Sequence, residues 1–195
     1  MIWDSVLWKN DLLRIAKKLD VLKNERMAEK QLFQAEKDIF VSFYIIRKLI
    51  EANKLSDKTV HRQYQLVKYN CKGKCVTIMN WHKIESLYDL KCKLKENHDL
   101  VYLCNQFIHS YVFVLSYSND EKAKGVYFCS DRERRRHVFY FSFKYLIDIL
   151  KIVGTDDVTK KKLVFNSSKQ DFTVNSSWWF VSTVFFLPKL MKGEI

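Results

Sequence analysis

The chain has 195 residues, which is enough for one domain with a sizeable core but short for two. Hydrophobic residues make up 48% of it and aromatic residues 15%, with only 4 Gly and 1 Pro, so the composition excludes an intrinsically disordered chain. The formal net charge of +12 favours a polyanionic partner, for which nucleic acid, an acidic protein and an anionic membrane are all candidates.

The N-terminal part of the chain predicts two amphipathic helices. Apolar residues recur at helical spacing over residues 3–22 and again over residues 25–53, and neither Gly nor Pro interrupts the second run. Asp4 and Asp11 fall among the apolar residues of the first helix, so it does not read as a secretory signal and we expect a cytoplasmic protein. The five cysteines form an odd set, which agrees with free thiols in a reducing compartment.

The middle of the chain predicts a change from helix to strand and back. Residues 64–79 carry strand-forming side chains on both sides of the motif CKGKC, which predicts a β-hairpin that turns at Gly73. Residues 80–91 predict a short helix. Residues 96–110, with the sequence ENHDLVYLCNQFIHS, predict a longer helix with Leu100 and Phe107 on its apolar face.

The last third predicts an antiparallel meander, a helix and a strand-rich tail. Short β-branched and aromatic runs over residues 111–142 are separated by NDEKAK and by the charged turn RERRR. Residues 144–154 return to helical spacing, with Gly154 as the expected C-cap. The tail contains predicted strands at 162–166 and 172–174. It ends in the apolar run WWFVSTVFF, about half the length that spans a bilayer, so we expect a core strand or a partner-binding edge and no membrane anchor.

Together these elements predict a single α+β domain over residues 1–195. Its helical part covers about 1–110 with a β-hairpin insertion near 64–79, its meander and C-terminal helix about 111–154, and its strand-rich tail 155–195. We expect the two long N-terminal helices to form a hairpin. This hairpin and the helix that carries NQFIH should then pack with the antiparallel sheet around one core.

Asn105 and His109 are the polar residues that point to chemistry. Four residues apart on a helix, their side chains share one face, with Ser110 beside them. A histidine that titrates near neutrality can move a proton to or from a ribose 2′-OH while an amide orients a phosphate, so the pair suits cleavage of RNA without a metal. The alternative is that both side chains hydrogen-bond inside the core and only stabilise it.

Two long N-terminal helices followed by a helix that ends in Asn-x-x-x-His resemble the HEPN superfamily. The resemblance implies an Arg-Asn-x-x-x-His type of motif, metal-independent RNA cleavage, a homodimer, and a role in bacterial defence or toxin systems. Asn105 and His109 match this motif, but Cys104 stands where its arginine would be. Since that arginine would hold the scissile phosphate, another cation would have to replace it, and Arg47 on the second helix is the candidate.

Arg47 can be interpreted in two ways. It lies four residues before Glu51, so the two can form an ordinary ion pair on a helix surface. In the second interpretation both side chains point toward the cleft of His109. His109 would then be the general acid or base, Asn105 the orienting residue and Arg47 the cation that stands in for the motif arginine.

The sequence SDRERRRHVF predicts a basic surface at a hairpin turn. Guanidinium groups suit phosphate because their planar fork makes bidentate contacts. The turn could therefore clamp a nucleic acid, or it could be a solvated turn whose arginines pair with Asp131 and Glu133. The candidate binding residues are Arg132, Arg134, Arg135, Arg136 and His137.

No metal or cofactor is expected. Cys71 and Cys75 are separated by three residues and no second pair follows, whereas zinc needs about four ligands. We therefore expect thiols that pack in the hairpin. With only 4 Gly the chain has no Gly-rich phosphate loop, which argues against a nucleotide cofactor.

The leading prediction is an RNA-binding, HEPN-like protein, either a metal-independent ribonuclease or a degenerate relative. The alternative is a non-enzymatic interaction module whose basic surface binds an acidic protein partner.

Overall fold

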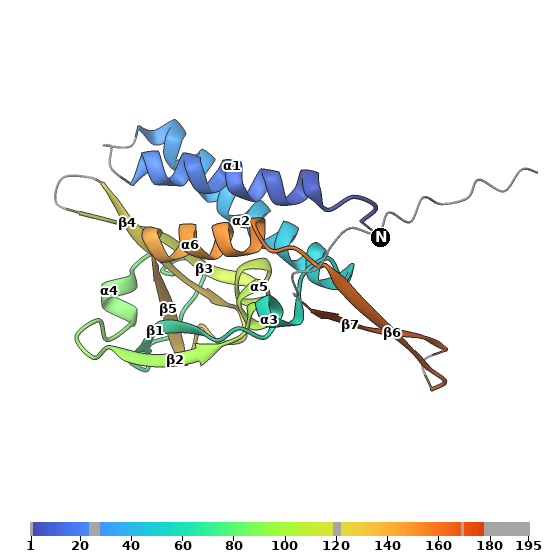
Figure 1. The fold of residues 1–195 in the computed structure, drawn as a ribbon. Helices are drawn as coiled ribbons and strands as arrows, with labels where there is room; N and C mark the ends of the chain where they lie inside the picture. Colours follow the sequence, from blue (N-terminus) through green and yellow to red (C-terminus); the bar gives the residue numbers. More distant parts are fainter. Residues whose placement is uncertain (1, 24–27, 119–121, 169, 178–195) are drawn as a thin grey trace, which may run out of the picture.

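The computed structural model describes residues 2–23, 28–118, 122–168 and 170–177 (Figure 1). It has the predicted α+β class of fold, in which helices pack on a five-stranded antiparallel sheet. The apolar run at residues 178–186 lies outside the described residues, so its role stays a prediction. None of the described helices is long and apolar enough to cross a membrane.

Three of the described helices are long. They are α1 (Val6–Leu22), α2 (Glu29–Glu51) and α6 (Phe143–Gly154). Each buries one apolar stripe and exposes charged residues elsewhere, as the helical spacing predicts. Figure 1 shows α1 lying over α6, which in turn lies over the sheet, and α1 also contacts α2. The remaining helices are α3 (Asp57–Val60), α4 (Ile84–Leu87) and α5 (Leu100–Ile108).

The sheet has the strand order β2–β1–β5–β4–β3, with every neighbouring pair antiparallel. The strands are β1 (Tyr64–Asn70), β2 (Leu94–His98), β3 (Ser110–Tyr117), β4 (Ala123–Ser130) and β5 (His137–Ser142). Strands β3, β4 and β5 form the predicted meander. The helix predicted over residues 96–110 is wrong at its start, because residues 96–98 belong to β2, which pairs with β1, and the helix begins only at Leu100. Alternate residues of β4 face opposite sides, so Phe128 enters the larger core beneath the helices and Cys129 a smaller apolar cluster beside α4.

The predicted β-hairpin at residues 64–79 is wrong. Its first strand exists as β1, but β1 pairs with β2 on one side and β5 on the other, and residues 71–79 form no strand. Gly73 does turn the chain, at φ +77°. The chain after this turn is held by side-chain burial instead: Val76 packs into the smaller cluster and its carbonyl oxygen accepts a hydrogen bond from the Arg134 guanidinium.

Gly154 has a different role from the predicted one. It is the last residue of α6, and Thr155 is the C-cap. A Cβ at this position would lie 2.7 Å from Leu13 Cδ2 and 3.2 Å from the carbonyl oxygen of Lys9, both on α1. Gly154 therefore lets α1 and α6 approach each other, a requirement set by tertiary packing that local sequence does not reveal.

The predicted tail strands form a separate two-stranded sheet. Strands β6 (Lys160–Asn166) and β7 (Asp171–Ser177) pair with each other and project from the body of the molecule (Figure 1). The side chains of Leu163, Phe165 and Phe172 are 59%, 58% and 56% exposed. These three apolar side chains are thus left uncovered by the described chain.

A buried polar network joins α1, α3 and the end of α6. The Asp156 carboxylate accepts hydrogen bonds from the Ser56 hydroxyl at 2.6 Å, the Ser56 backbone N–H at 2.7 Å and the Thr59 hydroxyl at 2.7 Å. Lys9 Nζ donates to the Asp156 carbonyl oxygen at 2.6 Å, and burial lowers the pKa of this lysine. The network satisfies polar groups that would otherwise be costly to bury.

Substitution of Gly125 should destabilise the sheet. A Cβ at this position in β4 would lie 2.1 Å from the Phe141 carbonyl oxygen of β5, a backbone atom that cannot move without breaking the strand pair. We expect Gly125→Ala to lower the free energy of unfolding by about 1–3 kcal/mol. Urea unfolding measures the change, with Lys124→Ala, at an exposed position of the same strand, as the control. Equal midpoints for the two variants would contradict the close approach.

Removal of the Asp156 carboxylate should also destabilise the fold. Asp156→Ala leaves the hydroxyls of Ser56 and Thr59 buried without their acceptor, and we expect a loss of roughly 2–4 kcal/mol in the free energy of unfolding. Asp157→Ala removes the same charge from an exposed neighbour and should have little effect. Thermal unfolding of the two variants distinguishes a buried network from a general charge effect.

Candidate functional site

Helix α5 carries the two polar residues of the predicted motif. Its N-cap residue is Asp99, whose carboxylate accepts a hydrogen bond from the Tyr102 N–H at 2.8 Å. Phe107, on its apolar stripe, stacks on Phe43 of α2 with ring centroids 3.7 Å apart. The opposite stripe is exposed at Asn105 and His109. Core packing therefore turns these two side chains outward, away from the larger core.

The predicted spacing of Asn105 and His109 is confirmed, with one change at the helix end. The His109 N–H donates to the Asn105 carbonyl oxygen at 3.1 Å, so one helical turn separates the two residues. His109 is the C-cap of α5, and β3 begins at the next residue. His109 thus occupies the junction between helix and sheet.

A pocket of about 500 Å³ opens beside this junction. One wall comes from α5, and the other from the end of β4 and the turn that follows it. Two hydrogen bonds hold the walls together: the Ser130 N–H donates to Gln106 Oε1 at 2.9 Å, and the Asp131 N–H to the His109 carbonyl oxygen at 3.1 Å. The lining residues are Tyr102, Asn105, Gln106, His109, Ser130, Asp131, Arg132 and Glu133. The pocket therefore brings together Asn105, His109 and Arg132, which the sequence predicts separately.

Arg47 of α2 contacts the pocket residue Asn105. Its Nη1 donates to Asn105 Oδ1 at 2.9 Å, across 58 positions of sequence, and its Nε donates to Glu51 Oε1 at 2.7 Å. Lys48 Nζ also binds Glu51, at 2.8 Å, and these contacts lower the pKa of the Glu51 carboxyl. Arg47 thus forms the surface ion pair of the first interpretation and also contacts Asn105. Neither Arg47 nor Glu51 lines the pocket at His109, so the second interpretation holds only for the contact of Arg47 with Asn105.

Cys104 takes no part in this surface. The side chain is fully buried in the larger core, and burial raises the pKa of its thiol to about 12. The position at which the HEPN-type motif has an arginine therefore faces the core in this chain. Any cation for the site must come from another element.

The arginine-rich turn between β4 and β5 divides into two kinds of residue. Arg134 is largely buried: its Nε lies 2.6 Å from Asp131 Oδ1 and its guanidinium 3.7 Å from the centre of the Tyr111 ring. Burial lowers the pKa of His137, which lies 3.6 Å from the Glu133 carboxylate. Both side chains hold the turn in place.

The other arginines of the turn face solvent. The Arg136 side chain is 75% exposed and lies 3.9 Å from Glu133. Arg132 and Arg135 are exposed and form no ion pair with any residue that the structure describes. Of the predicted binding set, Arg132, Arg135 and Arg136 are thus available to a ligand, and Arg132 lines the pocket.

Sequence reasoning did not assign Gln106 or Ser130 to the site. Gln106 is only 5% exposed, yet it lines the pocket and accepts a hydrogen bond from the Ser130 N–H. A signal was present, because Gln106 is a second amide in the apolar segment LCNQFIHS. The contribution of Ser130 depends on how β4 meets α5, which no local pattern specifies.

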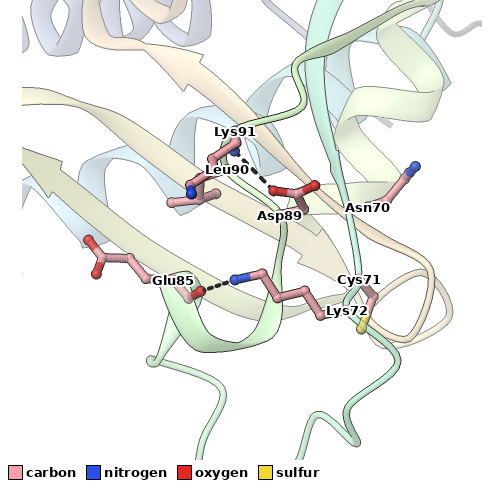
Figure 2. A pocket seen from close by; sticks show the side chains of 7 residues that line it. All are labelled: Asn70, Cys71, Lys72, Glu85, Asp89, Leu90 and Lys91. Atoms are coloured by element: carbon pink, nitrogen blue, oxygen red, sulfur yellow. Dashed lines mark hydrogen bonds between the residues drawn. The ribbon is translucent and has the colours of Figure 1, made fainter.

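A second hollow, of about 640 Å³, lies beside Cys71 (Figure 2). Lys72 Nζ donates to the Glu85 carbonyl oxygen at 2.7 Å, and the Lys91 N–H to Asp89 Oδ1 at 3.2 Å, so its polar groups bind one another. Cys71 forms a β-bridge with Tyr88 and does not lie in the predicted hairpin. Within the described ranges, no three His, Cys, Asp or Glu side chains lie close enough together to hold a metal ion.

Comparison of the chain with models of protein families, with curated proteins and with solved structures finds no match in any of the three.

Proposed function

We propose that the protein binds RNA at the pocket beside α5. It would be a HEPN-like protein of bacterial defence or toxin systems, either a metal-independent ribonuclease or a degenerate relative of one. The observation that carries this proposal is the hydrogen bond from Arg47 Nη1 to Asn105 Oδ1, 2.9 Å long. It provides a cation beside the Asn105–His109 pair, where the motif arginine is missing.

The chemistry assigned to the site is transesterification at a ribose 2′-OH. His109, exposed at the mouth of the pocket, would accept the 2′-OH proton or protonate the leaving oxygen. Asn105 would orient the phosphate. Arg47 would fix the Asn105 amide and add positive charge where negative charge develops. None of these steps requires a metal.

The surface charge supports a nucleic-acid ligand. The chain has a formal net charge of +12, and Arg132, Arg135 and Arg136 project from the turn that forms one wall of the pocket. Contacts to phosphates supply most of the affinity of non-specific nucleic-acid binding. Two acidic residues also line the pocket, but Asp131 is paired with Arg134, and Glu133 lies near Arg136 and His137.

The second candidate function is a non-enzymatic module that binds an acidic protein. The β6–β7 sheet favours it, because Lys160, Lys161 and Lys162 adjoin exposed apolar side chains at Leu163 and Phe165. A surface that combines lysines with uncovered apolar groups is suited to a protein partner. Co-purification with an acidic protein, without retained RNA, would favour this function.

His109→Ala should separate cleavage from binding. We expect the parent protein to cleave a mixed RNA pool in the presence of a chelator, and the variant to lose about 10²–10⁴-fold of that rate, because a general acid or base is removed. Retention of RNA on a filter should persist in both proteins and fall as salt rises. Retention without cleavage by the parent would identify a degenerate relative, and the absence of both signals would contradict the proposal.

Arg47→Ala should reduce cleavage about 10²–10³-fold, since it removes both the positive charge and the donor to Asn105. Lys48→Ala is the matched control, because Lys48 binds the same Glu51 carboxylate but has no contact with Asn105. Single-turnover rates of the two variants compare them. If both lose activity equally, the ion-pair cluster matters and the contact of Arg47 with Asn105 does not.

A further inference from the structure

The hydrogen bonds of the site fix the orientation of two side-chain amides. The Ser130 backbone N–H lies 2.9 Å from Gln106 Oε1 and can only donate, so an amide oxygen must face it. The Nε2 group of Gln106 then points to the other side. Because the partner is an obligate donor, an exchange of oxygen and nitrogen in the amide would place two donors together.

Asn105 is fixed in the same way. Its Oδ1 accepts from Arg47 Nη1, and a guanidinium has no acceptor, so the Asn105 NH₂ group must turn away from Arg47. Both amides line the same pocket. Neither NH₂ group has a hydrogen-bond partner among the residues that the structure describes.

An unpaired NH₂ group on Gln106 is the informative feature. The Gln106 side chain is only 5% exposed, but its Nε2 is not among the described buried nitrogen and oxygen atoms that lack a partner, so the NH₂ group is open to the pocket. Because Gln106 lines the pocket, a ligand oxygen bound there can accept a hydrogen bond from this NH₂ group. The pocket therefore favours a ligand that accepts hydrogen bonds.

Arg132 adds a positive charge to the pocket, which favours negatively charged acceptors over neutral ones. It lines the pocket, is exposed, and has no carboxylate partner in the described part of the chain. The two acidic residues of the lining are engaged elsewhere, by Arg134 in one case and by Arg136 and His137 in the other. Two amide donors and one free guanidinium favour an oxyanion over a neutral acceptor.

We propose that Asn105, Gln106 and Arg132 form a phosphate subsite. Gln106 and Asn105 donate from their NH₂ groups and Arg132 from its guanidinium, while Arg47 and the Ser130 N–H hold the two amides in the donating orientation. The pocket of about 500 Å³ exceeds one phosphate and accommodates the phosphate together with an attached sugar. That this phosphate belongs to RNA rests on the proposed function. The subsite itself does not.

Isosteric substitutions provide the test. Asn105→Asp and Gln106→Glu keep an oxygen for Arg47 and for the Ser130 N–H, but replace each NH₂ group with an oxygen that repels phosphate. Arg132→Gln removes the charge. Lys93→Gln, at an exposed position away from the pocket, is the charge-matched control. Circular dichroism and unfolding midpoints check each fold, and Asn105→Asp, at an exposed position, keeps the test valid if Gln106→Glu unfolds.

Binding of inorganic phosphate is measured by titration calorimetry at constant ionic strength, and retention of a mixed RNA pool on a filter in parallel. We expect Asn105→Asp, Gln106→Glu and Arg132→Gln each to weaken phosphate binding about 10- to 100-fold. Lys93→Gln should change it less than about threefold. Failure of the parent to bind phosphate, or equal effects of Arg132→Gln and Lys93→Gln, would overturn the subsite.

The two readouts separate the subsite from the RNA proposal. Phosphate and RNA both bound equally by the parent and all three pocket variants would overturn the subsite and leave RNA binding in place. Phosphate bound through Asn105, Gln106 and Arg132, with no RNA retained, would support the subsite and contradict RNA as its source. If the three pocket variants lose both phosphate binding and RNA retention while the Lys93→Gln control keeps them, the result supports both the subsite and RNA as its ligand.

Discussion

The stacking of Phe107 between Phe43 and Phe128 is the contact on which the rest of the site depends. The ring centroids lie 3.7 Å and 4.1 Å apart, and the three rings belong to α5, α2 and β4. Burial of each ring stabilises the fold by about 1.5–3 kcal/mol, and stacking adds about 0.5–1.5 kcal/mol for each pair. Rotation of α5 about its axis would remove Phe107 from both neighbours. The apolar stack therefore fixes which side chains of α5 face outward.

The polar residues of the site come from the same three elements, α2, α5 and β4. Arg47 follows Phe43 by one helical turn of α2, and Ser130 follows Phe128 by two residues of β4, so each is directed to the same side as its aromatic neighbour. Gln106 adjoins Phe107 in α5. Because the stack sets the spacing of the three backbones, Arg47 and Ser130 arrive within hydrogen-bonding distance of Asn105 and Gln106. Apolar packing therefore places these polar side chains before any ligand binds.

Local patterns were sufficient for the features that depend on neighbours in sequence. Helices α1, α2 and α6, the meander and the one-turn separation of Asn105 and His109 all follow from periodicity. The helix predicted over residues 96–110 is shorter than expected, because its first residues pair with β1 as part of β2. Features that depend on distant partners were not predictable: β1 pairs with β2 and β5, and Arg134 is buried against Tyr111 and Val76. For the same reason the sequence did not indicate that two residues of the arginine-rich turn, Arg134 and His137, are partly buried and hold the turn in place. The position of Arg47 on α2 suggested a contact with the site as one of two interpretations. The orientation of the Gln106 amide could not be predicted, because it depends on the Ser130 N–H of β4.

The contact between Lys9 and Asp156 joins residues 147 positions apart, and with Gly154 it seats α1 against α6. Contacts of such long sequence separation slow folding, because almost the whole chain must be closed into a loop first. At about 5–20 residues per second, α6 (Phe143–Gly154) is completed roughly 7–26 seconds after α1 (Val6–Leu22). The part of its apolar stripe that packs on α6 has no partner in that interval, so the nascent chain exposes an apolar surface that the finished protein conceals.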